Sequence, residues 1–188
     1  MTFLTSADHE LAEAFLNDGH VVRPAEDLPG LERIRAHAAE LAADHLKLGP
    51  ADDISDLLNT IHKRVDAATL NALRLAVFNG LNTESWFRPT YFSLARTLIE
   101  GLVGNELCMQ RRVNISIQMP NDESSLLPVH ADVWDGDSPF EVVLWVPLVD
   151  CFDTKAMYLM PPSKNRDVQA DLSKFNDSSA EDIFNAIA

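Results

Sequence analysis

Apolar side chains in the first hundred residues recur at intervals of three and four, which is the spacing of amphipathic helices. Ser6 and Asp66 are suited to cap helix N-termini, and Pro89 suits a first turn. Gly19 and Gly104 suit helix ends because glycine adopts the left-handed conformation at little cost. The pattern therefore predicts packing helices over 6–17, 31–48, 66–80 and 89–104.

In the second half of the chain the apolar positions alternate with a period of two. Over 112–119 the odd positions are apolar and the even positions are polar, so an extended chain would have one apolar face. Two continuous apolar runs, 141–149 and 155–161, indicate further strands with prolines near their ends. Helices followed by strands predict an α+β fold, mainly helical over 1–104 and β-rich over 105–188.

Composition narrows the class of protein. A chain of 188 residues that is 46% hydrophobic can bury one substantial core, which favours a single domain over 1–188. Its formal net charge of −14 disfavours nucleic acids and anionic membranes as partners. We find no signal-like leader and no apolar stretch of the ~20 residues that a membrane span needs, so we expect a cytoplasmic protein. Cys108 and Cys151 are expected to be buried thiols.

His130 and Asp132 form the candidate chemical motif, a His-x-Asp pair between the strand-like segments. Residues i and i+2 of an extended chain point to the same side, so the imidazole and the carboxylate could bind one ion. A second histidine would complete the two-His-one-carboxylate face that suits Fe(II). A His–Asp pair that is simply hydrogen-bonded within a loop is the alternative.

Three blocks around this pair carry a family resemblance: NISIQMP from Asn114, SSLLPVHADVWDGDSPFEVVLWVPLVDC from Ser124, and TKAMYLMPP from Thr154. They resemble Fe(II)/2-oxoglutarate-dependent oxygenases, in particular the phytanoyl-CoA dioxygenase-like group of bacterial carbohydrate-biosynthesis clusters. The resemblance implies a double-stranded β-helix of the jelly-roll or cupin type behind the N-terminal helices. It also implies that His130 and Asp132 bind iron, and that the reaction is the hydroxylation of a sugar or sugar conjugate.

The resemblance extends to the cosubstrate. Asn114 and Gln118 belong to the polar face that would line the mouth of such a barrel, where an amide could hydrogen-bond 2-oxoglutarate beside the metal. Lys155 begins the last strand-like run, where similar hydroxylases place a lysine that pairs with the distal carboxylate of 2-oxoglutarate. The alternatives are an amide that satisfies strand-edge backbone and a solvated lysine at a turn.

The third iron ligand is not evident, because no histidine follows His130. We expect 105–188 to be the first half of a jelly roll whose last strands are missing, so that this chain binds Fe(II) weakly and is inactive or impaired alone. A metal-free relative, or a site completed by a second chain in a homo-oligomer, would explain the same pattern. A non-catalytic cupin-like binding module and a cupin-type sugar isomerase or epimerase are the alternative functions.

Overall fold

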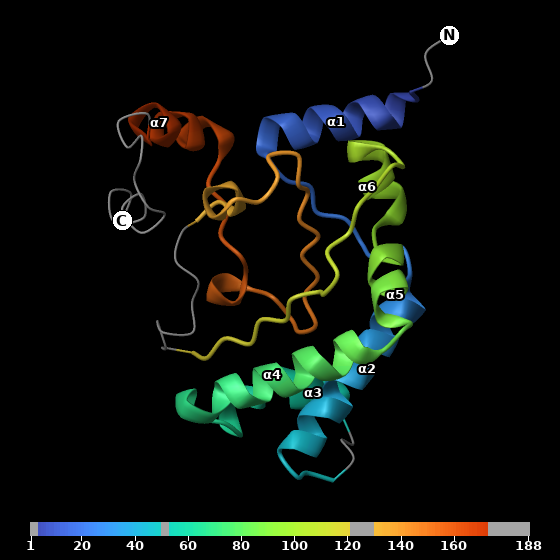
Figure 1. Ribbon diagram of the computed structural model, residues 1–188, viewed down its shortest axis with the longest axis vertical. Coiled ribbons are helices and arrows are strands. Elements are labelled where there is room, and N and C mark those ends of the chain that lie inside the picture. Colours follow the sequence, from blue (N-terminus) through green and yellow to red (C-terminus); the bar gives the residue numbers. More distant parts are fainter. Residues whose placement is uncertain (1–3, 50–52, 121–129, 173–188) are drawn as a thin grey trace.

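The computed structural model describes residues 4–49, 53–120 and 130–172 (Figure 1). The helices in these ranges are α1 Ser6–Asp18, α2 Leu28–His45, α3 Ile54–Asn59, α4 Ala67–Thr83, α5 Phe87–Ser93, α6 Arg96–Val103 and α7 Pro162–Leu172. Three short 3-10 turns accompany them: η1 Ile61–Lys63, η3 Asp132–Asp135 and η4 Asp153–Lys155. No helix in the described part of the chain is both long and apolar enough to cross a membrane.

Most of the helix boundaries follow the signals in the sequence. Thr5 rather than Ser6 caps α1 through a reciprocal capping box with Asp8, and Gly19 ends the helix at a φ of 74°. Asp66 caps α4, as expected. The helix expected over 89–104 is instead two helices, α5 and α6, because the carboxylate of Glu26 accepts hydrogen bonds from the first amides of α6 and gives it its own N-terminus.

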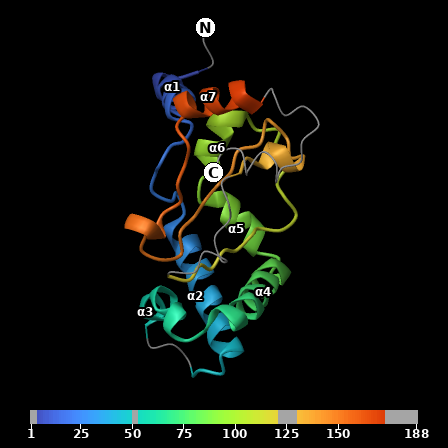
Figure 2. The same ribbon diagram turned by 90° about the vertical axis from the view of Figure 1, so that its left-hand side faces the viewer.

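The hydrophobic core lies where α2 crosses α4 and α5. Ile34 of α2, Leu73 and Leu81 of α4, and Phe87 of α5 are at most 2% exposed. Alanines of α2 are buried between them, which lets the helices approach closely. Figure 2 shows that α1, α6 and α7 gather at the end of the molecule away from α3 and α4. The helices thus form a continuous wall against which the rest of the chain lies.

Two extended segments, 111–119 and 141–149, lie against this wall (Figure 1). The odd positions Val113, Ile115 and Ile117 contact the helical core, and the even positions of the same segment are exposed. In the second segment Val146 and Leu148 contact the core, and the odd positions from 141 to 147 are exposed. The apolar face expected for 112–119 is therefore confirmed.

The β-sheet expected from the sequence is not confirmed. Among the residues that the structure describes there is no strand, so the prediction of an α+β fold with a jelly roll or cupin-like double-stranded β-helix is wrong. The reason lies in the hydrogen bonds. Strands need backbone partners on a neighbouring strand, whereas these segments are bonded by side chains from the helices. Residues 173–188, part of the expected half-barrel 105–188, lie outside the described ranges.

The bonds from helix side chains to segment backbone are specific. The amide of Asn82 accepts from Val113 N at 2.8 Å and donates to Val113 O at 2.9 Å, which reproduces the two bonds of a β-pair. Arg74 donates to Ile117 O at 2.7 Å. Tyr91 donates to Leu144 O at 2.5 Å, and Arg35 donates to Leu148 O at 3.1 Å. These contacts fix how both segments lie on the wall.

The two cysteines differ from expectation as well. Cys108 and Cys151 are both exposed free thiols rather than buried ones. Both lie in or next to the extended segments, where only one side of the chain contacts the helices. Burial was expected because free cysteines usually behave as small buried hydrophobes, and this expectation was wrong for both.

Replacing Asn82 by alanine should lower the free energy of unfolding by about 1–3 kcal/mol, because the N–H and C=O of buried Val113 lose their partner. Urea denaturation measures the change. Asn79→Ala is the matched control, since Asn79 lies exposed on the same helix. Equal stability of the two variants would contradict the role given to Asn82.

The burial of Tyr91 predicts that the free energy of unfolding depends on pH in the alkaline range. Burial raises the pKa of Tyr91 to about 12, whereas an unfolded tyrosine titrates near 10. The stability that the neutral phenol contributes is complete below about pH 10 and is lost as the pH rises towards 12. Between these values the wild-type chain should lose about 2–3 kcal/mol more than Tyr91→Phe, as measured by denaturation at each pH. The exposed Tyr158 provides the control, because Tyr158→Phe should keep the wild-type slope.

Candidate functional site

The candidate site centres on His130 and Asp132, which flank Ala131. The backbone of Ala131 is extended, with φ −128° and ψ 133°, so the two side chains lie on the same side of the chain as the sequence predicts. His130 Nε2 is 3.5 Å from Asp132 Oδ1. The side chains are 40% and 43% exposed, which leaves both accessible to a ligand from solution.

The separation of the two side chains is compatible with contact to one ion. A nitrogen and an oxygen 3.5 Å apart could bind one divalent ion, since bonds from such ligands to transition metals are about 2.0–2.2 Å long. In the ranges that the structure describes, however, no three His, Cys, Asp or Glu side chains are grouped to hold a metal. The described residues therefore bring together two side chains of ligand type and no third one.

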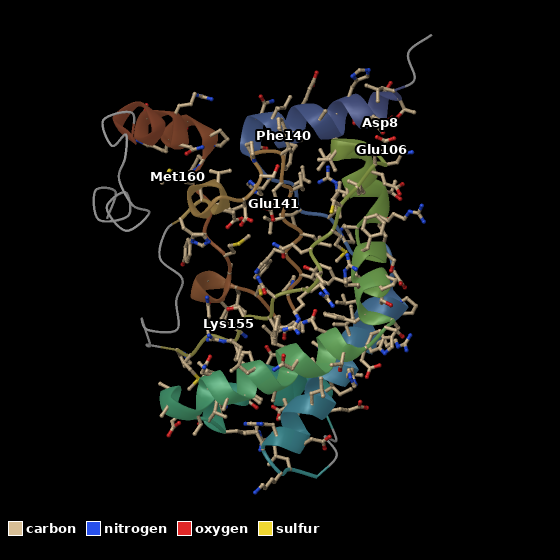
Figure 3. All side chains as sticks on the ribbon, in the orientation of Figure 1. Asp8, Glu106, Phe140, Glu141, Lys155 and Met160 are labelled. Atoms are coloured by element: carbon tan, nitrogen blue, oxygen red, sulfur yellow. The ribbon has the colours of Figure 1, made fainter. Side chains whose placement is uncertain are left out.

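Two further carboxylates, those of Asp137 and Glu141, lie near Asp132. Partial burial, together with the nearby carboxylates of Asp137 and Asp132, raises the pKa of Glu141. Figure 3 shows Glu141 between the helical wall and the loop that carries η3. The negative potential that these carboxylates share would favour a cation at Asp132 over an anion.

Asn114 and Gln118 lie on the exposed face of their segment, away from the helical core. This is the polar face on which the sequence places them. Within the described ranges neither amide hydrogen-bonds to His130 or Asp132, and the intervening residues 121–129 are outside those ranges. The structure thus leaves both amides open to a ligand without bringing them to the His–Asp pair.

Lys155 has protein partners of its own. Its Nζ donates to Asn59 Oδ1 at 3.0 Å and lies 4.9 Å from the centre of the Phe152 ring. It ends η4, which is separated from η3 in both ribbon views (Figures 1 and 2). The structure therefore ties Lys155 to α3 rather than placing it beside His130 and Asp132.

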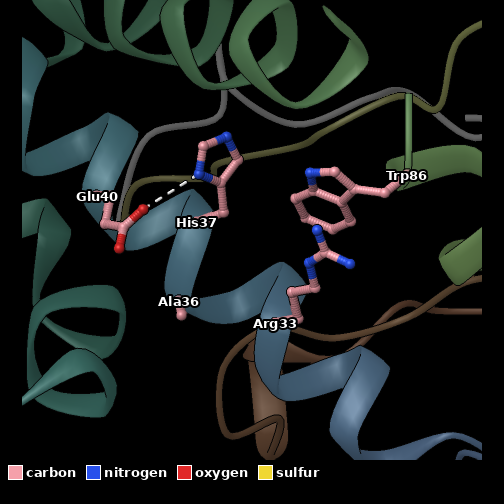
Figure 4. A pocket seen from close by; sticks show the side chains of 5 residues that line it. All are labelled: Arg33, Ala36, His37, Glu40 and Trp86. Atoms are coloured by element: carbon pink, nitrogen blue, oxygen red, sulfur yellow. Dashed lines mark hydrogen bonds and ion pairs between the residues drawn. The ribbon is translucent and has the colours of Figure 1, made fainter. Parts of the chain in front are cut away.

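Sequence reasoning missed a pocket of about 250 Å³ between one face of α2 and Trp86 (Figure 4). The guanidinium of Arg33 lies 3.9 Å from the centre of the Trp86 ring, and His37 Nδ1 is 3.2 Å from the carboxylate of Glu40. Trp86 donates to Glu84 at 2.8 Å. Positions 33, 36, 37 and 40 follow the i, i+3, i+4, i+7 spacing of one helix face, and this polar face was the signal that could have indicated it.

Comparison of the chain with models of protein families, with curated proteins and with solved structures finds no match.

Proposed function

We propose that this chain is an Fe(II)/2-oxoglutarate-dependent oxygenase in which His130 and Asp132 bind the metal. The single observation that carries the proposal is the approach of His130 Nε2 to Asp132 Oδ1, with both side chains accessible. Imidazole nitrogen and carboxylate oxygen are the ligand types of the facial iron site in this class of oxygenase. The acidic side chains around Asp132 support binding of a cation there.

We propose that Asn114, Gln118 and Lys155 receive 2-oxoglutarate. Asn114 and Gln118 present free amides on the exposed face of segment 111–119, and an amide can donate to a carboxylate. Lys155 would have to leave Asn59 to pair with the distal carboxylate of 2-oxoglutarate. The proposal therefore predicts that binding of 2-oxoglutarate disturbs the contact between η4 and α3.

Reaction and substrate follow from the resemblance of blocks 114–120, 124–151 and 154–162 to oxygenases. From that resemblance we propose that the reaction is the hydroxylation of a sugar or sugar conjugate in the cytoplasm. Because the described residues provide two metal ligands, we expect weak metal binding and impaired turnover from this chain by itself. The function proposed is accordingly binding of metal and cosubstrate at the His–Asp pair, with the reaction assigned by class.

Metal binding can be tested residue by residue with the paramagnetic ions Co(II) and Mn(II). In NMR spectra the ring signals of His130 should broaden at millimolar metal, and Asp132→Asn should abolish the effect because it removes the charged ligand. His9, which lies exposed on α1, is the internal control and should broaden far less. Equal broadening of all histidines would remove the case for a site at His130. Retention of stoichiometric iron after washing with a chelator would contradict the expectation of weak binding.

The cosubstrate gives a second signature. Under anaerobic conditions Fe(II) and 2-oxoglutarate together should produce the weak visible charge-transfer band of the chelate, and His130→Ala should remove it. His9→Ala is the matched control and should retain the band. A band that survives in His130→Ala would place the chelate elsewhere. No band at saturating iron and 2-oxoglutarate, with His130 broadening still present, would favour a non-catalytic binding module.

A further inference from the structure

The pocket beside α2 has a positive side chain at one end and a negative side chain at the other. Arg33 and Glu40 both line it, together with Ala36, His37 and Trp86. The two charged residues are seven positions apart on one helix, which is about 10 Å along the helix axis. Figure 4 shows Glu40 on the far side of His37 from the stacked Arg33 and Trp86. A ligand that fills the pocket therefore meets opposite charges at its two ends.

Arg33 is held in place without using its hydrogen-bond donors. Its guanidinium stacks on the indole ring of Trp86, with 3.9 Å between Cζ and the ring centre. The indole is itself fixed, because its Nε1 donates to Glu84 and its ring meets the buried Phe87 edge to face. Among the described residues the guanidinium N–H groups of Arg33 have no acceptor. A guanidinium that is already ordered loses little further freedom when it donates two hydrogen bonds to a carboxylate.

The negative end of the pocket is organised by His37. Its Nδ1 lies 3.2 Å from Oε2 of Glu40, and in the described part of the chain the other oxygen, Oε1, has no partner. The side chain of Glu40 is 72% exposed, so that a ligand can reach this oxygen. Between the two ends the wall of the pocket is formed by Ala36 and His37. The carboxylate of Glu40 can therefore accept a hydrogen bond from an ammonium group of a ligand.

Charge and size limit what the pocket can hold. The formal net charge of −14 repels anions, and a second carboxylate, that of Glu84, lies 3.8 Å from His37 Nε2. A dipolar molecule without net charge does not meet this repulsion. The volume of about 250 Å³ is smaller than the roughly 300–1,000 Å³ of sites for drug-sized ligands, so the ligand has to be small.

We propose that this pocket binds a small dipolar molecule with a carboxylate and an ammonium group at opposite ends of a short aliphatic chain. The carboxylate accepts hydrogen bonds from Arg33, and the ammonium group donates to Glu40. An ω-amino acid meets this requirement. An α-amino acid does not, because its two charged groups are adjacent and cannot reach both ends of the pocket. The site does not depend on the function proposed for His130 and Asp132.

An NMR titration of the whole chain tests the class of ligand. The signal of the Trp86 indole N–H should shift with 4-aminobutanoate, and the dissociation constant should be about threefold or more lower than for butanoate, butylamine or glycine. Each of these three lacks one charge or the separation between charges. The indole signal of Trp145 is the internal control and should not move. No shift of the Trp86 signal at about 100 mM 4-aminobutanoate, or binding of butanoate or glycine as tight as that of 4-aminobutanoate, would overturn the proposal.

Substitutions test the two ends separately. Arg33→Gln should raise the dissociation constant of 4-aminobutanoate about tenfold and Glu40→Gln about threefold, because paired hydrogen bonds from a guanidinium contribute more than one exposed carboxylate. Arg64→Gln and Glu13→Gln are the matched controls, since both residues are exposed on other parts of the chain, and they should leave the constant unchanged. Glu40→Gln should also leave the weak binding of butanoate unchanged, which shows that the pocket itself is intact. Wild-type affinity in Arg33→Gln would rule out the site.

Discussion

The arrangement of this chain depends on hydrogen bonds that helix side chains make to the backbone of extended segments. Backbone N–H and C=O groups that lose water must find partners, and in a sheet a neighbouring strand provides them. Here Asn82, Tyr91 and Arg35 take that place, each reaching from a helix to a residue of segment 111–119 or 141–149. The apolar faces of the segments can then lie on the helical core while Val113 N–H, Val113 C=O, Leu144 C=O and Leu148 C=O keep hydrogen-bond partners.

The helices could be predicted because their signals are local. The Asp66 cap and the Gly19 end lie next to the residues that they affect, and both were placed correctly. The division between α5 and α6 could not be predicted, since it depends on Glu26, about 70 residues earlier in the chain. The same limit applies to the sheet. The alternation over 112–119 correctly identified the buried face, but a face does not determine whether the edge of a segment meets a strand or a helix.

In the candidate site, too, the local contacts could be predicted from the sequence and the contacts between distant residues could not. His130 and Asp132 are two residues apart on extended backbone, so their approach follows from local geometry. The position of Lys155 depends on Asn59, which is 96 residues away, and no pattern around Lys155 indicates that partner. The pocket at Arg33 and Trp86 could be indicated only in part, because one face of α2 is visible in the sequence whereas Trp86, which precedes α5, meets that face only in the folded chain.

The bonds between helices and segments also set an order of folding. Arg35 and Leu148 are 113 residues apart, and Tyr91 and Leu144 are 53 apart, whereas the helix caps join residues three apart. Contacts between distant residues have to overcome a larger loop-closure entropy, so they form after local ones. Helices α1 to α6 all precede residue 104, so during synthesis they can fold before residue 148 has been added. The later segments dock onto a helical surface that already exists. Their placement is determined by the helix side chains that bond to their backbone.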